Sequence, residues 1–83
     1  MEESVIYGKL KVLLQNYISD PELYKRVSLQ AHLVNDLGIK PNKLVDISIA
    51  IEDEFDIEFA EEEIKYLNSP GKIIDMVRAK LYQ

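Results

Sequence analysis

The hydrophobic and polar positions of this chain follow helical spacing in three separate stretches. Within each stretch apolar residues recur every three or four positions, which is typical of an amphipathic helix with one buried face. No stretch shows the strict alternation that marks a half-buried strand. The sequence therefore predicts an all-α fold. The apolar positions are Ile6, Leu10, Leu13, Leu14, Tyr17 and Ile18, then Leu44, Ile47, Ile51 and Phe55, and finally Ile73, Ile74, Val77 and Leu81.

Capping residues and prolines indicate where the first helix ends and where the last begins. The first stretch is followed by "SDPE" at 19–22. Ser19 or Asp20 can cap a short helical turn there, and Pro21 suits its first position. In "SPGK" at 69–72, Ser69 is the expected N-cap and Pro70 the first residue of the final helix.

The second helix is expected to begin at Pro41 and to run to about Asp56. Proline loses no hydrogen bond at a first helical turn, because that N–H has no partner there. A long connection at 22–40 precedes this helix, and a short helix is expected at about 60–67, "AEEEIKYL". Connections of that length are uncommon in compact domains and often functional. The apolar anchors of the connection are Leu23, Val27, Leu29, Leu33 and Leu37.

The second helix carries a further apolar row, formed by Val45 and Ile49. At about 100° per residue, this row lies to one side of the core stripe. Ile49 therefore has two interpretations, packing against the long connection or contact with a partner protein.

Length and composition indicate one small domain that spans residues 1–83. The chain has 83 residues, 47% of them hydrophobic, and no cysteine. The lack of cysteine excludes disulfides, thiolate metal sites and cysteine nucleophiles. The acidic start, "MEESVIYG", does not look like a secretory signal, and the apolar run "ISIAI" is too short to cross a bilayer. We therefore expect a cytoplasmic protein.

The charge is negative and unevenly distributed. The formal net charge is −5, and every charged residue from Asp46 to Glu63 is acidic. Such a segment repels the phosphates of nucleic acids and anionic membranes. It suits a basic patch on another protein, or it simply solubilises the domain. We expect protein partners with basic patches, and no nucleic acid or membrane.

Catalytic chemistry finds little support in the sequence. His32 is the only histidine, and Asp36 could pair with it only if that stretch were helical. A positioned nucleophile and an oxyanion hole are not indicated. The carboxylates of "EDEFDIE" lack the spacing and the glycine of a calcium loop. The prediction is a protein that is not an enzyme, with no catalytic residue and no metal ligand.

The segment "NDLGIKPNKLVDISIAIEDEFDIEFAEEEIKYLNSPGKIIDMV" resembles an acyl carrier protein. Asp36, Leu37 and Gly38 match the D-L-G of that family. "IEDEFDIEF" matches the end of its second helix, and "AEEEIKYL" its short acidic third helix. The resemblance covers nearly the whole chain. It implies a small four-helix bundle with a long first helix, a long loop, a second helix, a short third helix and a fourth, and it implies a monomer.

The resemblance fails at the residues that carry the family's chemistry. A serine at the start of the second helix holds phosphopantetheine in that family, and Pro41 occupies this position here. Lys40 replaces an aspartate that helps the modifying transferase to hold Mg²⁺, and an ammonium cannot ligate a metal. Asn42 replaces a leucine that contacts partner enzymes, and Lys43 replaces an aspartate. We therefore expect no phosphopantetheine at Pro41 and no other cofactor.

Ser48 is the remaining candidate for a modified hydroxyl, seven residues after Pro41. A hydroxyl within a helix tends to bond to the carbonyl four residues earlier. The alternative role of Ser48 is therefore that of a small helical spacer.

The resemblance also implies that the second helix is the docking surface. Acyl-transfer or synthase enzymes with basic patches are the partners it suggests. Lys40 and Lys43 reverse the charge at the start of the helix, and Ile49 falls where the family has an apolar contact. The predicted contact residues are Lys40, Lys43, Asp46, Ile49, Glu52, Asp53 and Asp56.

Three interpretations follow from the sequence. The favoured one is a degenerate acyl-carrier-like protein that acts by docking on partners. The second is a divergent carrier in biosynthesis of the fatty-acid or polyketide type, modified at another serine or binding acyl groups non-covalently. The third is an unrelated acidic helical interaction module.

Overall fold

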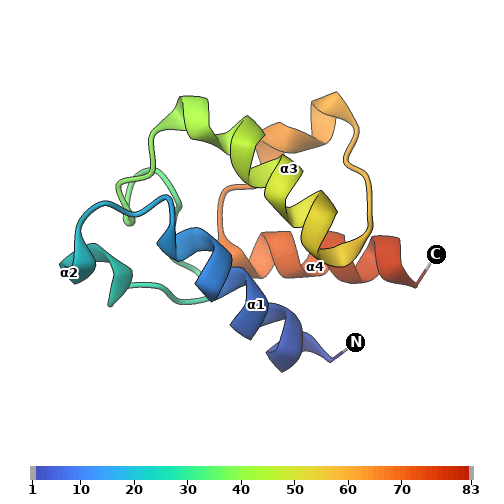
Figure 1. Cartoon of the computed structure of the whole chain (residues 1–83), viewed down its shortest axis with the longest axis horizontal. Helices are drawn as coiled ribbons and strands as arrows, with labels where there is room; N and C mark the ends of the chain where they lie inside the picture. The colour runs from blue at the N-terminus through green and yellow to red at the C-terminus, as the bar shows by residue number, and fades with distance from the viewer. Residues whose placement is uncertain (1, 83) are drawn as a thin grey trace.

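The structure is a computed structural model that describes residues 2–82. This part of the chain contains helices and no strand. It begins with a long helix, continues through a long connection to a second helix, and ends with a short helix and a final one (Figure 1). The predicted small bundle of acyl-carrier-protein type is confirmed. In chain order the elements are α1 (Glu3–Gln15), α2 (Pro21–Tyr24), the 3₁₀ helix η1 (Pro41–Lys43), α3 (Leu44–Phe55), the 3₁₀ helix η2 (Glu61–Tyr66) and α4 (Pro70–Leu81).

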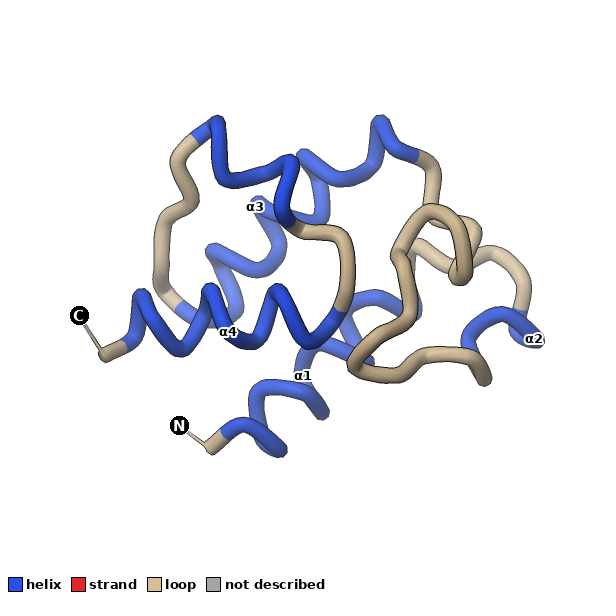
Figure 2. Tube along the Cα trace, turned by 180° about the vertical axis from the view of Figure 1, so that it is seen from behind, coloured by secondary structure: helices blue, strands red, loops and turns tan. Residues whose placement is uncertain are grey.

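The core lies where α1 packs against both α3 and α4. Each helix turns the stripe that the sequence predicted toward this core, because burial of an apolar side chain is the main favourable term in folding. Seen from behind, α1 begins and α4 ends on the same side of the molecule (Figure 2). The residues with no exposed surface include Ile6, Leu10, Leu14, Ile47, Ile51, Ile73, Ile74 and Val77.

The helix caps are those that the sequence indicated. The carboxylate of Asp20, rather than the hydroxyl of Ser19, accepts the Glu22 N–H at 2.9 Å and caps α2. The Ser69 hydroxyl accepts the Lys72 N–H at 3.2 Å and caps α4, with Pro70 as its first residue. These bonds satisfy N–H groups that have no partner within the helix.

Two elements differ from the sequence prediction in their helix type. The second helix starts at Pro41 as predicted, but its first turn is the 3₁₀ helix η1, in which the Lys43 N–H donates to the Lys40 carbonyl at 2.9 Å. The predicted short third helix is the 3₁₀ helix η2. Bonds three residues apart tighten a short segment whose ends are held by the rest of the fold.

The long connection at 25–40 is anchored rather than loose. Leu33 and Leu37 are fully buried, and the Leu33 N–H donates to the Asn68 carbonyl at 2.9 Å. The Gly71 N–H donates to the Leu29 carbonyl, also at 2.9 Å. A Cβ at position 71 would lie 2.9 Å from the same carbonyl oxygen, so only glycine allows this approach. These bonds fix the connection against the start of α4.

No helix within residues 2–82 combines the length and the apolar character that a membrane span requires.

Candidate functional site

The turn before α3 presents the position where the resemblance expects a serine. Gly38 has a φ of 70°, a conformation that favours glycine. Ile39 is buried, and its N–H donates to the Leu33 carbonyl at 3.0 Å, so the chain is held just before the helix. Pro41 follows as the first residue of η1 and is exposed. The position is thus open to solvent and rigidly placed, but it carries no hydroxyl.

The side chains around Pro41 are basic and exposed. Lys43 approaches Asp46 at 3.8 Å, with both side chains about half exposed. Lys40 forms no ion pair with any residue in 2–82. These two lysines face a recess of about 320 Å³ between the end of α1 and the start of α3. The recess is also lined by Asn16, Tyr17, Ser19 and Gly38.

Ser48 lies on the buried face of α3. Its residue is 2% exposed, and its hydroxyl donates to the Val45 carbonyl at 2.6 Å. The acceptor is three residues earlier, not four as the sequence suggested. The geometry is that of a small helical spacer and gives an enzyme no access to the oxygen.

The groups at the start of α3 do not fit phosphopantetheine. Attachment needs a hydroxyl that a transferase can reach. Pro41 is accessible and has none, whereas Ser48 has one and is enclosed. The segment from Pro41 to Ser48 therefore offers no exposed hydroxyl for the arm.

The outward face of α3 carries the second apolar row. Val45 is 51% exposed and Ile49 is 50% exposed. Half of the Ile49 surface is therefore open to solvent and available to a partner, while the other half is covered within the fold. Val45 was not among the predicted contact residues, although its spacing of four from Ile49 places both on one face.

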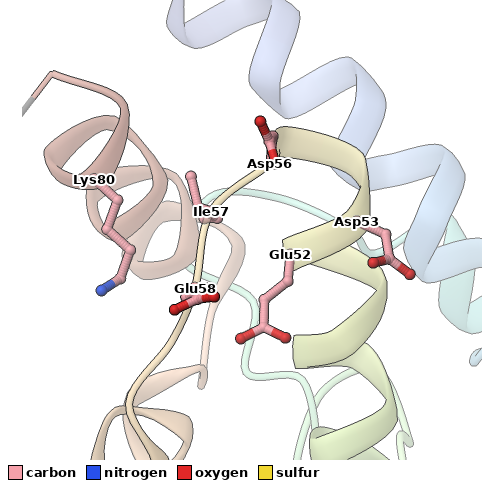
Figure 3. A pocket seen from close by; sticks show the side chains of 6 residues that line it. All are labelled: Glu52, Asp53, Asp56, Ile57, Glu58 and Lys80. Carbon is pink, nitrogen blue, oxygen red and sulfur yellow. The ribbon is translucent and has the colours of Figure 1, made fainter.

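The acidic residues at the end of α3 surround an open hollow of about 740 Å³. Figure 3 shows the Glu52 and Glu58 carboxylates facing the hollow, with Lys80 on α4 at its far side. Asp53 and Asp56 point away from its centre and toward solvent (Figure 3). Ile57 completes the lining.

Glu52 has a structural bond that the sequence did not reveal. Its carboxylate accepts the Phe59 N–H at 2.8 Å and so ties α3 to the segment that follows it. Asp56 ends α3 in the left-handed conformation, with a φ of 55°. Non-glycine residues rarely adopt this conformation, although aspartate tolerates it better than most.

Glu63 and Lys80 form a latch beside the same hollow. The Glu63 carboxylate accepts the Ala60 N–H at 2.7 Å and pairs with the Lys80 ammonium at 2.9 Å. The Ala60 hydrogen bond, and after it the Lys80 ammonium, lower the pKa of the Glu63 carboxyl. Lys80 also lies 5.5 Å from the centre of the Phe59 ring. The latch joins η2 to α4. Its two residues are 17 positions apart, so no local sequence pattern indicates that they pair.

His32 has a local structural role. Its ring Nδ1 accepts the N–H groups of Val34 and Asn35 at 3.2 and 3.1 Å. The Asp36 carboxylate accepts the backbone N–H of His32 at 2.7 Å and is not paired with the ring. The two residues close a turn. Across residues 2–82, no group of three or more histidine and carboxylate side chains is arranged to hold a metal ion.

Comparisons with known proteins agree on one kind of relative. An acyl carrier protein from Coprothermobacter proteolyticus is 28% identical over 82 residues, covering 99% of this chain and 98% of the relative. One from Buchnera aphidicola is 30% identical over 78 residues, covering 94% and 85%. A mitochondrial acyl carrier protein from Neurospora crassa is 25% identical over 79 residues, covering 93% and 57%. No protein-family model matches the chain.

Proposed function

The chain belongs to the acyl carrier protein family, and we propose that it is a degenerate member that acts by docking α3 on partner proteins. On this proposal it has kept the carrier scaffold, has lost the attachment point for phosphopantetheine, and works without a catalytic step. Membership of the family overturns the interpretation as an unrelated helical module.

One observation carries the proposal. The start of α3 is exposed and rigidly held, as a modification site requires, yet the residue there is Pro41. Proline suits the first turn of a helix, so the fold tolerates the substitution that removes the chemistry. The neighbours Lys40 and Lys43 are cations, which oppose the approach of Mg²⁺ to this end of the helix.

The outer face of α3 supports the docking half of the proposal. Val45 and Ile49 expose about half of their surface, although the core beneath them is complete without them. Asp53 and Asp56 lie beyond them and are exposed. An apolar centre with charged residues at its rim is the usual anatomy of a protein interface. Acyl-transfer or synthase enzymes are the proposed partners, in a cytoplasmic setting and with the chain as a monomer.

The second candidate, a carrier modified at another serine, has weaker support. Ser48 would have to leave the buried face of α3 and give up its bond to the Val45 carbonyl before a transferase could reach it. That change would expose the core beside it. A carrier that holds acyl groups non-covalently is not favoured by the hollow at the end of α3, which is lined by four carboxylates, one lysine and one isoleucine.

The test is the intact mass after incubation with coenzyme A and a broad-specificity phosphopantetheinyl transferase. The native chain should gain nothing. A Lys40→Asp, Pro41→Ser double variant should gain one phosphopantetheine, because it restores the hydroxyl and the acidic neighbour. A matched Lys25→Asp, Pro21→Ser variant, changed in α2 instead, should remain unmodified.

A gain of one phosphopantetheine on the native chain would overturn the degenerate interpretation. Peptide mapping would then identify the modified hydroxyl, with a Ser48→Ala variant as the control.

A further inference from the structure

The outer face of α3 carries opposite charge at its two ends. Lys40 and Lys43 lie at its start, and Asp53 and Asp56 lie at its end. Asp53 follows Lys43 by ten positions, which correspond to about 15 Å along a helix axis. The two charged ends are therefore separated by more than a Debye length of about 8 Å at physiological salt. A partner meets them as two distinct sites.

The middle of the same face is apolar. Val45, Ile49 and Asp53 follow one another at intervals of four, so they form one line along the helix. Val45 and Ile49 are both about half exposed. A partner that covers this line buries them and reaches both charged ends.

The basic end is not neutralised within the fold. Lys40 has no ion-pair partner among residues 2–82, and the 3.8 Å contact between Lys43 and Asp46 is exposed to water. Exposed pairs of this kind contribute little stability. The recess beside the two lysines has a volume of about 320 Å³ and offers the polar side chains of Asn16 and Ser19. It has room for one acidic side chain.

The lysine beside the acidic end, by contrast, is already paired with a carboxylate outside α3. Lys80 is the lysine that lines the hollow there, and the latch commits it to Glu63 at 2.9 Å. Glu52 is committed to the Phe59 N–H. Glu54 lies 3.8 Å from Lys9. Asp53 and Asp56 are therefore the exposed carboxylates of α3 and its C-cap at this end that have no ion-pair partner among residues 2–82.

We propose that the partner of α3 presents a bipolar surface: an acidic side chain that enters the Lys40–Lys43 recess, an apolar side chain over Val45 and Ile49, and basic side chains against Asp53 and Asp56. This inference rests on the proposed docking function and specifies its partner. A uniformly basic surface would place like charges against the two lysines. A small anion would leave the apolar middle uncovered, and an anionic membrane would be repelled at the acidic end.

The experiment uses two synthetic helical peptides of equal length with the same central leucines. One carries glutamates at one end and arginines at the other, and the second carries arginines at both ends. Each is titrated into the ¹⁵N-labelled chain at about 0.15 M salt, where screening limits the effect of net charge. Binding is measured from the amide shifts of Val45, Ile49 and Asp53.

The measured quantity is the ratio of the affinities for the bipolar and the all-basic peptide. In a Lys40→Asp, Lys43→Asp variant this ratio should fall about tenfold relative to the native chain, because two attractive contacts become repulsive ones. A Lys25→Asp, Lys72→Asp variant has the same net charge, with its changes outside α3. Its ratio should stay within about twofold of the native ratio.

If the affinity ratio fell equally in both variants, the bipolar partner would be overturned, but the proposal that α3 is the docking surface would stand. The same conclusion would follow if the shifts at Val45 and Ile49 appeared without peptide as the chain is concentrated, since a second copy would then cover the face. If neither peptide moved these amides in any variant, both the bipolar partner and the docking function would be overturned.

Discussion

The inner and the outer face of α3 both carry apolar residues, but only those on the inner face are buried by folding. Ile47, Ile51 and Phe55 on the inner face lose almost all contact with water, and their spacing accounts for the position of the helix. Val45 and Ile49 on the outer face are equally apolar, yet about half of their surface remains exposed. Folding gives no reason for their hydrophobicity. Burial therefore accounts for the apolar residues on the inner face, and the proposed docking function accounts for those on the outer face.

The same contrast locates the divergence of this chain within its family. The inner face and the latch beyond it form a complete carrier scaffold. The departures at Lys40, Pro41 and Lys43 all lie on exposed positions at the start of the outer surface. Exposed positions tolerate substitution with little effect on stability. On the proposed function, the loss of the attachment point would therefore leave the fold intact.

The largest expected effect comes from replacing one isoleucine on each face of α3 with alanine. Ile51→Ala should lower the free energy of unfolding by about 3 kcal/mol, because it empties a fully buried position. Ile49→Ala should change it by less than about 0.5 kcal/mol. Chemical denaturation of both variants measures the difference. Similar losses for both would mean that the outer row also supports the fold.

A smaller effect is expected at the turn that positions the basic end. Gly38→Ala should lower the free energy of unfolding by about 1–2 kcal/mol, because position 38 requires a positive φ. The added Cβ would also lie 2.9 Å from the end of the Leu23 side chain. Gly8 in α1 provides the control, since a Cβ there meets nothing within 4 Å. Gly8→Ala should stabilise the helix by about 0.5–1 kcal/mol. Thermal denaturation that ranked the two variants in the opposite order would contradict this account of the turn.

Asp56 lies at the exposed end of α3 in a left-handed backbone conformation, which costs stability for any residue but glycine. Asp56→Gly should stabilise the fold by about 1 kcal/mol, since glycine adopts the left-handed conformation without strain and removes a negative charge from a helix C-terminus. Asp53→Gly, within the helix, should destabilise it by about 1 kcal/mol. The melting temperatures should therefore move in opposite directions. Both variants should weaken binding to the bipolar peptide, which a purely structural role of these carboxylates would not predict.

The smallest effect on stability is expected from the latch between Glu63 and Lys80, which lies beside the acidic end of α3. The pKa of Glu63 lies below its ordinary value of 4.5, so its ionised form stabilises the folded state. This contribution is fully present above that ordinary value and is lost as the pH falls through the lowered pKa. Glu63→Gln should therefore be less stable than the native chain at pH 7, and the gap should close toward acid pH.

Urea unfolding at several pH values measures this gap. In a Lys80→Met background the gap should shrink but persist, because the larger cause of the shift is the Ala60 hydrogen bond. A gap that stays constant down to the lowest pH would contradict the latch.

Helical spacing alone predicted most of the fold, since a helix that buries one face must repeat its apolar residues every three or four positions. It identified the fully buried Ile51, and the capping residues and prolines indicated the caps at Asp20 and Ser69. It could not choose between α and 3₁₀ geometry for 41–43 and 61–66, because that choice depends on how the rest of the fold holds a short segment.

The candidate site was only partly accessible to the same reasoning. The resemblance located Pro41 and the charged residues around it. It could not decide whether Ile49 is exposed, because its spacing is compatible with either a loop or solvent above it. Nor could it find the bond from the Phe59 N–H to Glu52, which depends on the path of the chain after α3. The exposed face and the latch became visible only in three dimensions.

If the start of α3 serves only function, its residues can be exchanged without disturbing the scaffold. The most direct measurement compares the ¹H–¹⁵N amide spectra of the native chain and the Lys40→Asp, Pro41→Ser variant. The account predicts shifts confined to residues 38–46 and to Asn16, Tyr17 and Ser19 across the recess. Shifts that extend to Ile51, Phe55 and Leu67, or a loss of spectral dispersion, would contradict it, because the basic end would then be part of what holds the fold together.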